Sequence, residues 1–278
     1  MLKKHKKLLI ALPVVLVLSV VAILFSHELF TTLPMSIAIS SHTDKAPVMI
    51  AHRGLSSLYP QNTLPAFEGA VEHGFYGYEL DIHTTKDGEW VVIHDDTVDA
   101  MTDGSGDIEN YSFDELQQFV IDGGNGIENY PDMKIPTLKE SLKYAVENDI
   151  VPFIEIKKCD KTLLPTLKEM LDEMKLSEKA VLISFDREYL EIYRQLDENA
   201  EIMLLKGKPT KDDVDWCVEY NAGLDFGYHS FYKIGGVMKY AGEKGVELGA
   251  WTVDNTAIFD FLVFFYDVKS ITTNKILP

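Results

Sequence analysis

Two acidic residues lie inside a strongly apolar stretch of the sequence. Glu79 and Asp81 alternate with Tyr78, Leu80 and Ile82, so in an extended strand both carboxylates point to the same face. A solvated edge would explain one such residue. Two like charges this close on one face repel each other unless a cation lies between them. The pair therefore predicts a cation site.

A third acid fits the same site. Glu155 lies near the end of the apolar segment 151–156, and Lys157 follows on the same face of that strand. Three carboxylates without a cysteine favour one hard divalent cation with oxygen ligands, either Ca²⁺ or Mg²⁺. Lys157 either forms an ion pair with one of the acids or binds an anionic substrate.

A turn connects this strand with a histidine. Residues 86–89 read Lys-Asp-Gly-Glu, which is typical of a turn between two strands, so we expect a hairpin over 82–93. If the turn is centred on the Asp-Gly pair, Asp81 faces His94 across the hairpin. The hairpin thus adds an imidazole to the acidic cluster.

The apolar segment 47–51 ends in His52, Arg53 and a glycine. Arginine presents a planar pair of donors that suits phosphate, and histidine moves protons near neutral pH. With His94 and Lys157, these residues suit the cleavage of a phosphodiester. One histidine would deprotonate the attacking hydroxyl and the other would protonate the leaving oxygen, while Arg53 and the cation stabilise charge on phosphorus. Either histidine can take either role.

Strand-like and helix-like segments alternate along the body of the chain. The predicted strands are 47–51, 76–82, 90–93, 151–156, 180–184, 201–205, 222–226, 246–251 and 268–272, and predicted helices include 63–73, 137–148, 162–174 and 187–196. This alternation indicates an α/β fold with a parallel sheet. Because one arm of the hairpin is an extension, eight strands remain and predict a TIM (β/α)₈ barrel. An open doubly wound sheet is the alternative, but it usually brings a glycine-rich phosphate loop, which this sequence lacks.

The same residues resemble the glycerophosphodiester phosphodiesterase family, within the superfamily of phospholipase C-like phosphodiesterases. The resemblance rests on the segments His52-Arg53-Gly54, Pro60-Gln61-Asn62-Thr63, Glu79-Leu80-Asp81, Thr85-Lys86-Asp87-Gly88, Val91-Val92-Ile93-His94-Asp95 and Glu155-Ile156-Lys157. It covers roughly residues 48–157 and then thins to 184–186 and 251–253. The combination is far more specific than any one of its parts.

This resemblance implies a TIM barrel that cleaves glycerophosphodiesters to glycerol 3-phosphate and an alcohol. By position it assigns general acid/base catalysis to His52 and His94, one divalent cation to Glu79, Asp81 and Glu155, phosphate binding to Arg53 and Lys157, and substrate contact to Trp251. The implied substrate is a small glycerophosphodiester or a glycerol-phosphate polymer. Either the glycerol hydroxyl attacks first and forms a cyclic phosphate, or water attacks directly.

The chain departs from the family pattern at several positions. Gln61 stands where the family usually has Glu, and Ala100 stands where an Arg often precedes the segment 102–106. The family's last strand usually carries Gly-Val-Asp-Gly and a later Asp, whereas this chain reads Asp-Val-Lys-Ser-Ile-Thr-Thr-Asn over 267–274. The change at position 100 bears on substrate preference.

The beginning of the chain predicts a membrane anchor. Residues 8–26 form a run of 19 uncharged residues, about 28 Å long as a helix, which is enough to cross a bilayer core. Four lysines precede this run and place the N-terminus in the cytoplasm. A cleaved signal peptide is the alternative. In both cases the body of the protein lies outside the cytoplasm, as in a bacterial cell-surface protein.

We therefore expect a chain in three parts. Residues 1–27 would hold the cytoplasmic lysine cluster and an N-terminal transmembrane helix, 28–46 a tether and 47–278 the barrel domain. Within that domain, the long segment of about 96–136 would be an insertion that frames the pocket.

Composition excludes several classes of protein. With 46% hydrophobic and 25% charged residues the chain has enough apolar residues for a core, and its two cysteines cannot make a disulfide framework. The net charge is −18 overall; residues 1–40 carry +3, so the remaining 238 residues carry −21. Such an acidic body would repel nucleic acid. The sequence makes no prediction of an oligomeric state.

Two further functions are compatible with these residues. A phospholipase D-like enzyme acting on lysophospholipids would need an apolar groove beside the site, which the strongly apolar segment 258–266 could supply. The second possible function is that of a non-catalytic, membrane-anchored binding protein with the same barrel fold. The complete set of two histidines and three acids argues against it.

Overall fold

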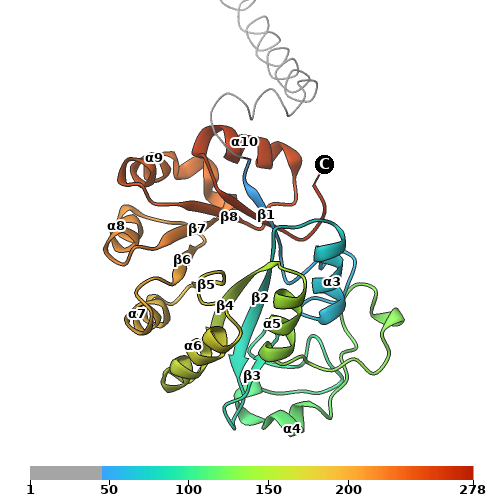
Figure 1. The fold of residues 1–278 in the computed structure, drawn as a ribbon. Helices are drawn as coiled ribbons and strands as arrows, with labels where there is room; N and C mark the ends of the chain where they lie inside the picture. The colour runs from blue at the N-terminus through green and yellow to red at the C-terminus, as the bar shows by residue number, and fades with distance from the viewer. Residues whose placement is uncertain (1–45, 278) are drawn as a thin grey trace, which may run out of the picture. The chain divides into compact units, whose positions relative to one another are not determined.

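A computed structural model describes residues 46–277 of the chain (Figure 1). The predicted anchor, 1–27, and all but the last residue of the predicted tether, 28–46, lie outside these residues. Within the described range, no helix combines the length and the apolar character that a membrane span requires.

Nine strands form one sheet in the described part of the chain. They are β1 Val48–Ala51, β2 Gly77–Thr84, β3 Trp90–Val92, β4 Val151–Lys158, β5 Val181–Ser184, β6 Glu201–Lys206, β7 Gly223–Gly227, β8 Leu248–Trp251 and β9 Ser270–Thr273. Their order is β1-β9-β8-β7-β6-β5-β4-β2-β3, and β1 also pairs with β2. Eight parallel strands therefore close into a ring, while β3 is antiparallel and lies outside it. The predicted TIM barrel is confirmed, and the open doubly wound sheet is excluded.

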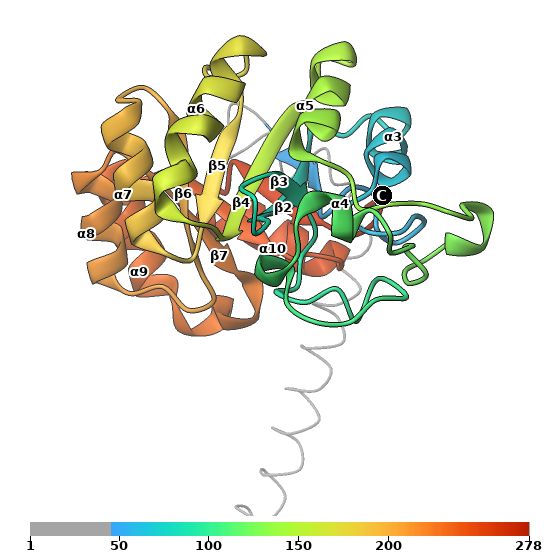
Figure 2. The ribbon, with the colours of Figure 1, turned by 90° about the horizontal axis from the view of Figure 1, so that it is seen from below.

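Helices surround this barrel and connect its strands (Figures 1 and 2). They are α3 Leu64–Glu72, α5 Leu138–Glu147, α6 Leu164–Glu173, α7 Arg187–Leu196, α8 Lys211–Glu219, α9 Gly235–Lys244 and α10 Thr256–Tyr266. The short helix α4 Phe113–Leu116 lies in a segment beside the barrel, and there are four 3₁₀ turns in the described residues, η1 Ile108–Asn110, η2 Ile127–Asn129, η3 Lys161–Leu163 and η4 Tyr228–Lys233. Local sequence explains where several begin. Thr137 and Thr210 form capping boxes at α5 and α8, and the Asp186 side chain caps α7.

The hairpin of β2 and β3 forms, but its predicted register is wrong by one residue. The register pairs Ile82 with Val92, His83 with Val91 and Thr84 with Trp90. The Asp81 carbonyl accordingly accepts a hydrogen bond from Ile93, and Asp81 does not face His94. The cause is the turn: residues 85–89 enclose a three-residue loop in which Gly88 has a φ of +86°. Three-residue hairpin loops of this kind use a left-handed residue, which glycine supplies without strain.

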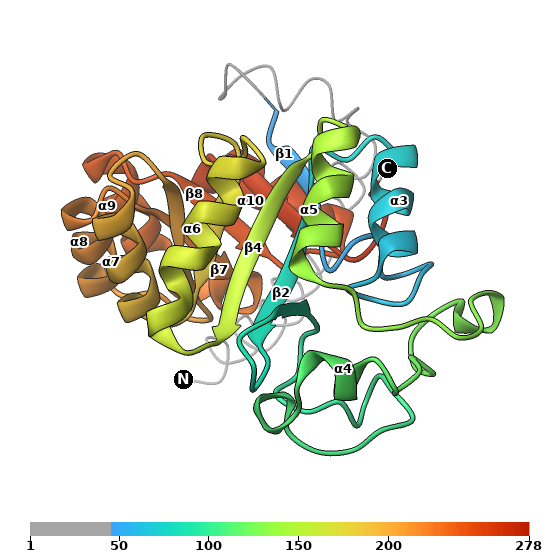
Figure 3. The same ribbon diagram turned by 60° about the horizontal axis from the view of Figure 1, so that its bottom comes forward.

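The segment between β3 and α5 has a small core of its own. It carries η1, α4 and η2, and it lies beside the barrel near the end of β2 (Figure 3). Its buried side chains Val98, Met101, Ile108, Leu116, Ile121 and Ile135 pack with Val91 and Ile93 of the hairpin region. This packing holds the residues just before His94 in place, so the segment supports the wall of the site.

The barrel interior changes from apolar to polar along its strands. Ile50, Val151, Phe153, Ile183, Met203 and Leu205 form an apolar cluster inside the ring. Nearer the carboxyl ends, Glu79, Asp81 and Glu155 are also buried. Burying three acids at one end of a barrel lowers stability, and active sites of such barrels lie at this end.

Candidate active site

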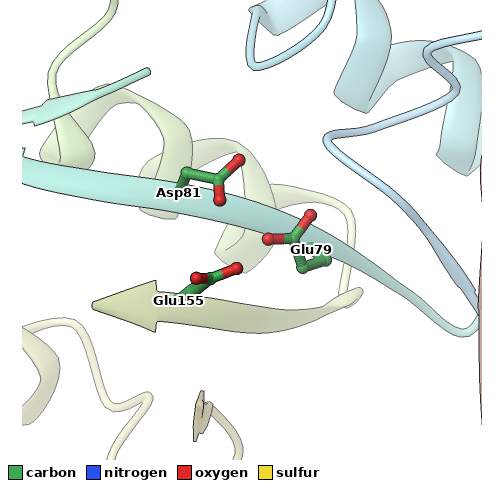
Figure 4. Close-up of side chains that lie close together, drawn as sticks. All are labelled: Glu79, Asp81 and Glu155. Atoms are coloured by element: carbon green, nitrogen blue, oxygen red, sulfur yellow. The ribbon is translucent and has the colours of Figure 1, made fainter. Parts of the chain in front are cut away.

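Three carboxylates meet on the neighbouring strands β2 and β4 (Figure 4). Glu79 and Asp81 come from β2, and Glu155 is the register partner of Asp81 on β4. One carboxylate oxygen from each lies within 4.8 Å of the others, and all three residues are buried. The predicted acidic cluster is therefore present in the fold.

Burial and mutual repulsion act on these carboxyl groups. Burial, with the neighbouring charges of Asp81 and Glu155, raises the pKa of Glu79 well above its ordinary value. Burial and Asp81 raise the pKa of Glu155 to about 7. Burial also favours a higher pKa at Asp81, but nearby positive side chains, Arg53 foremost, outweigh it and hold the pKa below its ordinary value. Two of the three acids thus resist ionisation in this arrangement.

The cluster fits a hard divalent cation. Glu79 Oε1 and Asp81 Oδ1 are buried, and neither has a hydrogen-bond partner among residues 46–277. Unpaired buried oxygens are costly, so a ligand for them is expected. Lys157 Nζ lies 2.9 Å from Glu155 Oε1 and 3.8 Å from Asp81 Oδ1, which offsets only part of the negative charge. Oxygen ligands alone are the set that Ca²⁺ and Mg²⁺ accept.

The loop after β1 holds two of the acids in place. The backbone N–H of Arg53 donates to Glu79 Oε2 over 2.8 Å, and Arg53 adopts a φ of +56° in that loop. Asn62 Nδ2 donates to Asp81 Oδ2 over 2.8 Å, and the Asp81 N–H returns a bond to Asn62 Oδ1. Each acid therefore keeps one oxygen bound to the protein and one oxygen free for a ligand.

Arg53 extends its side chain along the edge of this cluster. Its Nη1 donates to Gln61 Oε1 over 2.7 Å, and its Nε lies 3.4 Å from Asp81 Oδ2. A glutamate at position 61 would form an ion pair there, whereas the neutral amide of Gln61 leaves more of the guanidinium charge for an anion. The departure from the family pattern thus keeps the orientation of Arg53 and raises its local positive charge.

His52 is held from the strand on the other side of β1. Its Nδ1 lies 2.7 Å from Asn274 Oδ1. Asn274 Nδ2 donates to Asp254 Oδ2 over 2.6 Å, so the amide oxygen of Asn274 must face the imidazole. Burial and the Arg53 charge lower the pKa of His52 to about 4. The ring is therefore neutral near pH 7, with its proton on Nδ1 and a lone pair on Nε2.

His94 has a carboxylate partner instead of an amide. Its Nδ1 lies 2.6 Å from Oδ1 of Asp95, and this contact fixes the orientation of the ring. On the neighbouring strand β2, His83 Nε2 donates to the carbonyl oxygen of His94 over 3.2 Å. Burial lowers the pKa of His83 and keeps it neutral. His83 thus positions the backbone that carries His94.

The predicted residues converge on one cavity of about 170 Å³. Its lining comprises His52, Arg53, Glu79, His94, Glu155, Lys157, Ile183, Phe185, Leu205, Asp225, Trp251, Thr252 and Thr272. All predicted site residues except Asp81 line it. Asp81 is fully buried within the adjoining carboxylate cluster.

Aromatic and aliphatic side chains form the other wall of the cavity. The rings of Trp251 and Phe185 meet edge to face with centroids 5.4 Å apart, and Trp251 Nε1 donates to the carbonyl oxygen of Asp225. Lys157 Nζ lies 6.0 Å from the centre of the Phe185 ring, where the charged and apolar walls meet. A cavity with one charged wall and one apolar wall suits a molecule that has a phosphate at one end and an uncharged carbon skeleton at the other.

The sequence did not predict several residues that hold the predicted site residues in place. Asn274 ends a segment that departs from the family pattern, but its contact with His52 has no local signal, because the two residues are 222 positions apart in the chain. Its own partner Asp254 is equally inconspicuous. Asn62 belongs to a recognised segment but had no predicted role. Asp225 does carry a signal, because it is an acid within an apolar strand, as Glu79 is.

A parallel (β/α)₈ barrel with two imidazoles, an arginine and a buried carboxylate cluster at its strand ends defines a phosphate-ester hydrolase as the class of protein. The model of the Glycerophosphoryl diester phosphodiesterase family matches residues 52–277. The chain belongs to this family and is a phosphoric diester hydrolase.

Individual relatives agree with this assignment. The glycerophosphodiester phosphodiesterase of Caldanaerobacter subterraneus is 33% identical over 214 residues, which are 74% of this chain and 86% of that protein. Human glycerophosphodiester phosphodiesterase 1 is 33% identical over 186 residues, and the match spans 66% of this chain and 54% of the human protein.

Solved structures share the fold. A glycerophosphodiester phosphodiesterase from Parabacteroides distasonis has a TM-score of 0.70 and 27% identity, covering 82% of this chain and 92% of that one. An Oleispira antarctica phosphodiesterase, solved with its product sn-glycerol-3-phosphate, has a TM-score of 0.74 and 23% identity, covering 82% and 93%. At that lower identity the likeness concerns the fold alone.

Proposed function

We propose that the protein hydrolyses glycerophosphodiesters to glycerol 3-phosphate and an alcohol, with one divalent cation, Ca²⁺ or Mg²⁺, and two histidines. The observation that carries the proposal is the single cavity that joins His52, His94 and Arg53 to buried carboxylates with unpaired oxygens. Family membership supports the substrate class, and so does the name of the Caldanaerobacter relative, a glycerophosphodiester phosphodiesterase that is 33% identical.

Glu79, Asp81 and Glu155 would hold the cation. When bound, it offsets their charge and stabilises negative charge that develops on a phosphoryl oxygen. Arg53 and Lys157 flank the same position, and their positive charges favour a phosphate there. Trp251 would pack against the carbon skeleton of the substrate.

His52 suits the role of general base. Its Nε2 has a free lone pair, because the amide oxygen of Asn274 keeps the ring proton on Nδ1. Its low pKa keeps the ring unprotonated over most of the pH range. It would take the proton of the attacking hydroxyl, which belongs either to water or to the glycerol group of the substrate.

His94 suits the role of general acid. The Asp95 carboxylate accepts the hydrogen bond of Nδ1–H and orients the ring, so that in the imidazolium form Nε2–H would donate to the leaving alcohol oxygen. The two histidines thus differ in the charge of their partners, which is the pattern expected of an acid and a base that act together.

Exchanging the two partners of His52 should move the pH profile. In the double variant Asp254→Asn with Asn274→Asp, the hydrogen bond between them is kept, but His52 now faces a carboxylate. That charge should raise the pKa of His52 by about 1–3 units. Because protonated His52 cannot accept a proton, the acidic limb of kcat/KM should move to higher pH by the same amount.

The pH dependence of kcat/KM with glycerophosphocholine checks this expectation. Asp254→Asn alone is the matched control. Both oxygens of Asp254 accept hydrogen bonds from Asn274, and the amide leaves only one acceptor, so activity should fall without the same displacement of the limb. An unchanged acidic limb in a folded, active double variant would contradict the role assigned to His52.

The proposed activity is tested with the full chain. Release of glycerol 3-phosphate from glycerophosphocholine, glycerophosphoglycerol and a glycerol-phosphate polymer is measured with Ca²⁺, with Mg²⁺ and with chelator. ³¹P NMR during the reaction detects any cyclic phosphate. Lysophosphatidylcholine serves as the comparison substrate. Turnover of lysophosphatidylcholine alone would replace the proposed substrate class, and no turnover of any diester by the folded protein would reject the activity.

We also propose that residues 8–26 anchor the protein in a membrane with the barrel domain outside the cytoplasm. The uncharged run and the four preceding lysines support this. In a bacterial host, the protein should sediment with membranes and resist extraction by high salt, and protease added to spheroplasts should degrade the barrel domain. Recovery of a shortened chain in the soluble fraction would favour a cleaved signal peptide.

A further inference from the structure

Asp225 is a buried acid that the proposed chemistry does not use. It lies in the middle of β7, where its neighbours Leu224 and Phe226 are fully buried on the other face of the strand. Asp225 is 3% exposed, yet it lines the cavity together with His52 and Trp251. Its Oδ1 has no hydrogen-bond partner among residues 46–277. A buried carboxyl oxygen without a partner calls for a ligand.

The fold leaves space for this carboxyl group. Gly249 on β8 is the register partner of Asp225. A Cβ atom at position 249 would lie 2.7 Å from Asp225 Oδ1 and 2.8 Å from Ser270 Oγ. Any side chain there would collide with the acid, so glycine at this position keeps the acid where it lies. The backbone of the barrel therefore fixes the position of this carboxyl group beside the cavity.

The position of Asp225 suits a neutral polar ligand. Its oxygens are not part of the cluster in which Glu79, Asp81 and Glu155 lie within 4.8 Å of one another, so it does not extend the cation site. The cavity around it is lined by Ile183, Leu205 and Trp251, whose apolar side chains favour contact with the carbon skeleton of a ligand. A carboxyl oxygen accepts a hydrogen bond from a hydroxyl in either protonation state, so Asp225 can bind such a group.

We propose that Asp225 is a specificity-determining residue that hydrogen-bonds a hydroxyl of the substrate's glycerol group. The phosphate would lie against Arg53 and Lys157, and the glycerol carbons would extend along the apolar wall until a hydroxyl reaches Asp225. This inference rests on the proposed function. It explains how one cavity would select a glycerol ester over an ester whose corresponding group lacks that hydroxyl.

The test compares substrates as well as variants. Wild-type full chain, loaded with the cation that supports activity, is assayed with glycerophosphocholine and with two analogues, 2-hydroxypropyl and 3-hydroxypropyl phosphocholine, each lacking one glycerol hydroxyl. The wild type should prefer glycerophosphocholine over one of them by about 10²-fold in kcat/KM, because a site built for a hydroxyl rejects a ligand without it. In Asp225→Leu this preference should fall to within about 3-fold of unity.

Two further variants keep the test decisive. Asp225→Asn preserves shape and should change the preference by about 3- to 10-fold, even if the leucine variant fails to fold. Gly249→Ala keeps the acid but displaces it, so the same preference should fall. Circular dichroism and thermal unfolding report whether each variant is folded.

Two results would overturn the inference about Asp225 alone. In one, a folded Asp225→Leu or Asp225→Asn variant keeps the wild-type preference. In the other, kcat/KM falls by the same factor for all three substrates, which would make Asp225 a structural residue. Failure of the wild type to cleave any of the three diesters would instead count against the proposed function.

Discussion

Replacing His52 or His94 with glutamine should lower kcat/KM for glycerophosphocholine by about 10²- to 10⁴-fold each, because each ring moves a proton in the transition state. Glutamine is close in size and can still form one hydrogen bond, so the fold should be retained. His73, which lies at the exposed end of α3, is the matched control. His73→Gln should stay within about 2-fold of the wild type.

A substrate with a better leaving group should separate the two histidines. In glycerol 3-(4-nitrophenyl) phosphate, 4-nitrophenolate departs without being protonated, so a general acid contributes little. His94→Gln should therefore recover most of its lost activity with this substrate, whereas His52→Gln should not. The release of 4-nitrophenolate is followed by absorbance. Equal losses with both substrates, or recovery by His52→Gln instead, would refute the assigned roles.

Removing the cation should abolish turnover and also destabilise the fold in a pH-dependent way. Glu79 and Glu155 have pKa values above those of the unfolded chain. The metal-free protein therefore binds these protons more tightly when folded. The stabilising contribution of these two groups is fully present at low pH and is lost as pH rises from about 4.3 through about 7. A bound cation should reverse this loss, because it binds the ionised carboxylates.

Thermal unfolding measures this effect at pH 5.5 and pH 8. A cation at about 100 times its Kd contributes about 2.7 kcal/mol, which corresponds to a rise in Tm of about 5–10 °C for a domain of this size. The rise should be larger at pH 8. The variant Glu79→Gln should be more stable than wild type without metal at pH 8, should show a much smaller rise, and should lose activity.

The control for this variant is Glu219→Gln, on the exposed surface of α8. It removes one negative charge far from the cluster, so it should keep both the activity and the cation-dependent rise in Tm. A wild-type Tm that responds to neither Ca²⁺ nor Mg²⁺ at pH 8, together with activity in chelator, would reject the cation site.

Much of the fold could be predicted because its signals are local. The predicted helix over 187–196 coincides with α7, and eight of the nine predicted strands correspond to the parallel strands of the barrel. Glu79 and Asp81 stood out because a solvated edge explains one acid in an apolar strand but not two like charges on one face. The alternation of side chains along a strand places these two on the same face, and Glu155 is a third acid in an apolar strand. These inferences need only a few consecutive residues.

The register of the hairpin could not be predicted in this way. A turn of two residues and a turn of three residues use the same residue types, and they differ in the conformation of one glycine, Gly88. The difference of one residue decides that Asp81 lies opposite Ile93. It also leaves His94 beyond the paired residues, where His83 and Asp95 hold it.

The partners of the catalytic groups were decided only by the tertiary structure. Closure of the ring pairs β1 with β9, and this brings His52 to Asn274 across 222 positions of sequence. Pairing of β7 with β8 sets Asp225 beside Gly249. No local pattern encodes such contacts, because they depend on which strands become neighbours when the barrel closes. The sequence by itself therefore determined the kind of chemistry, and barrel closure determined which neighbours tune each group that performs it.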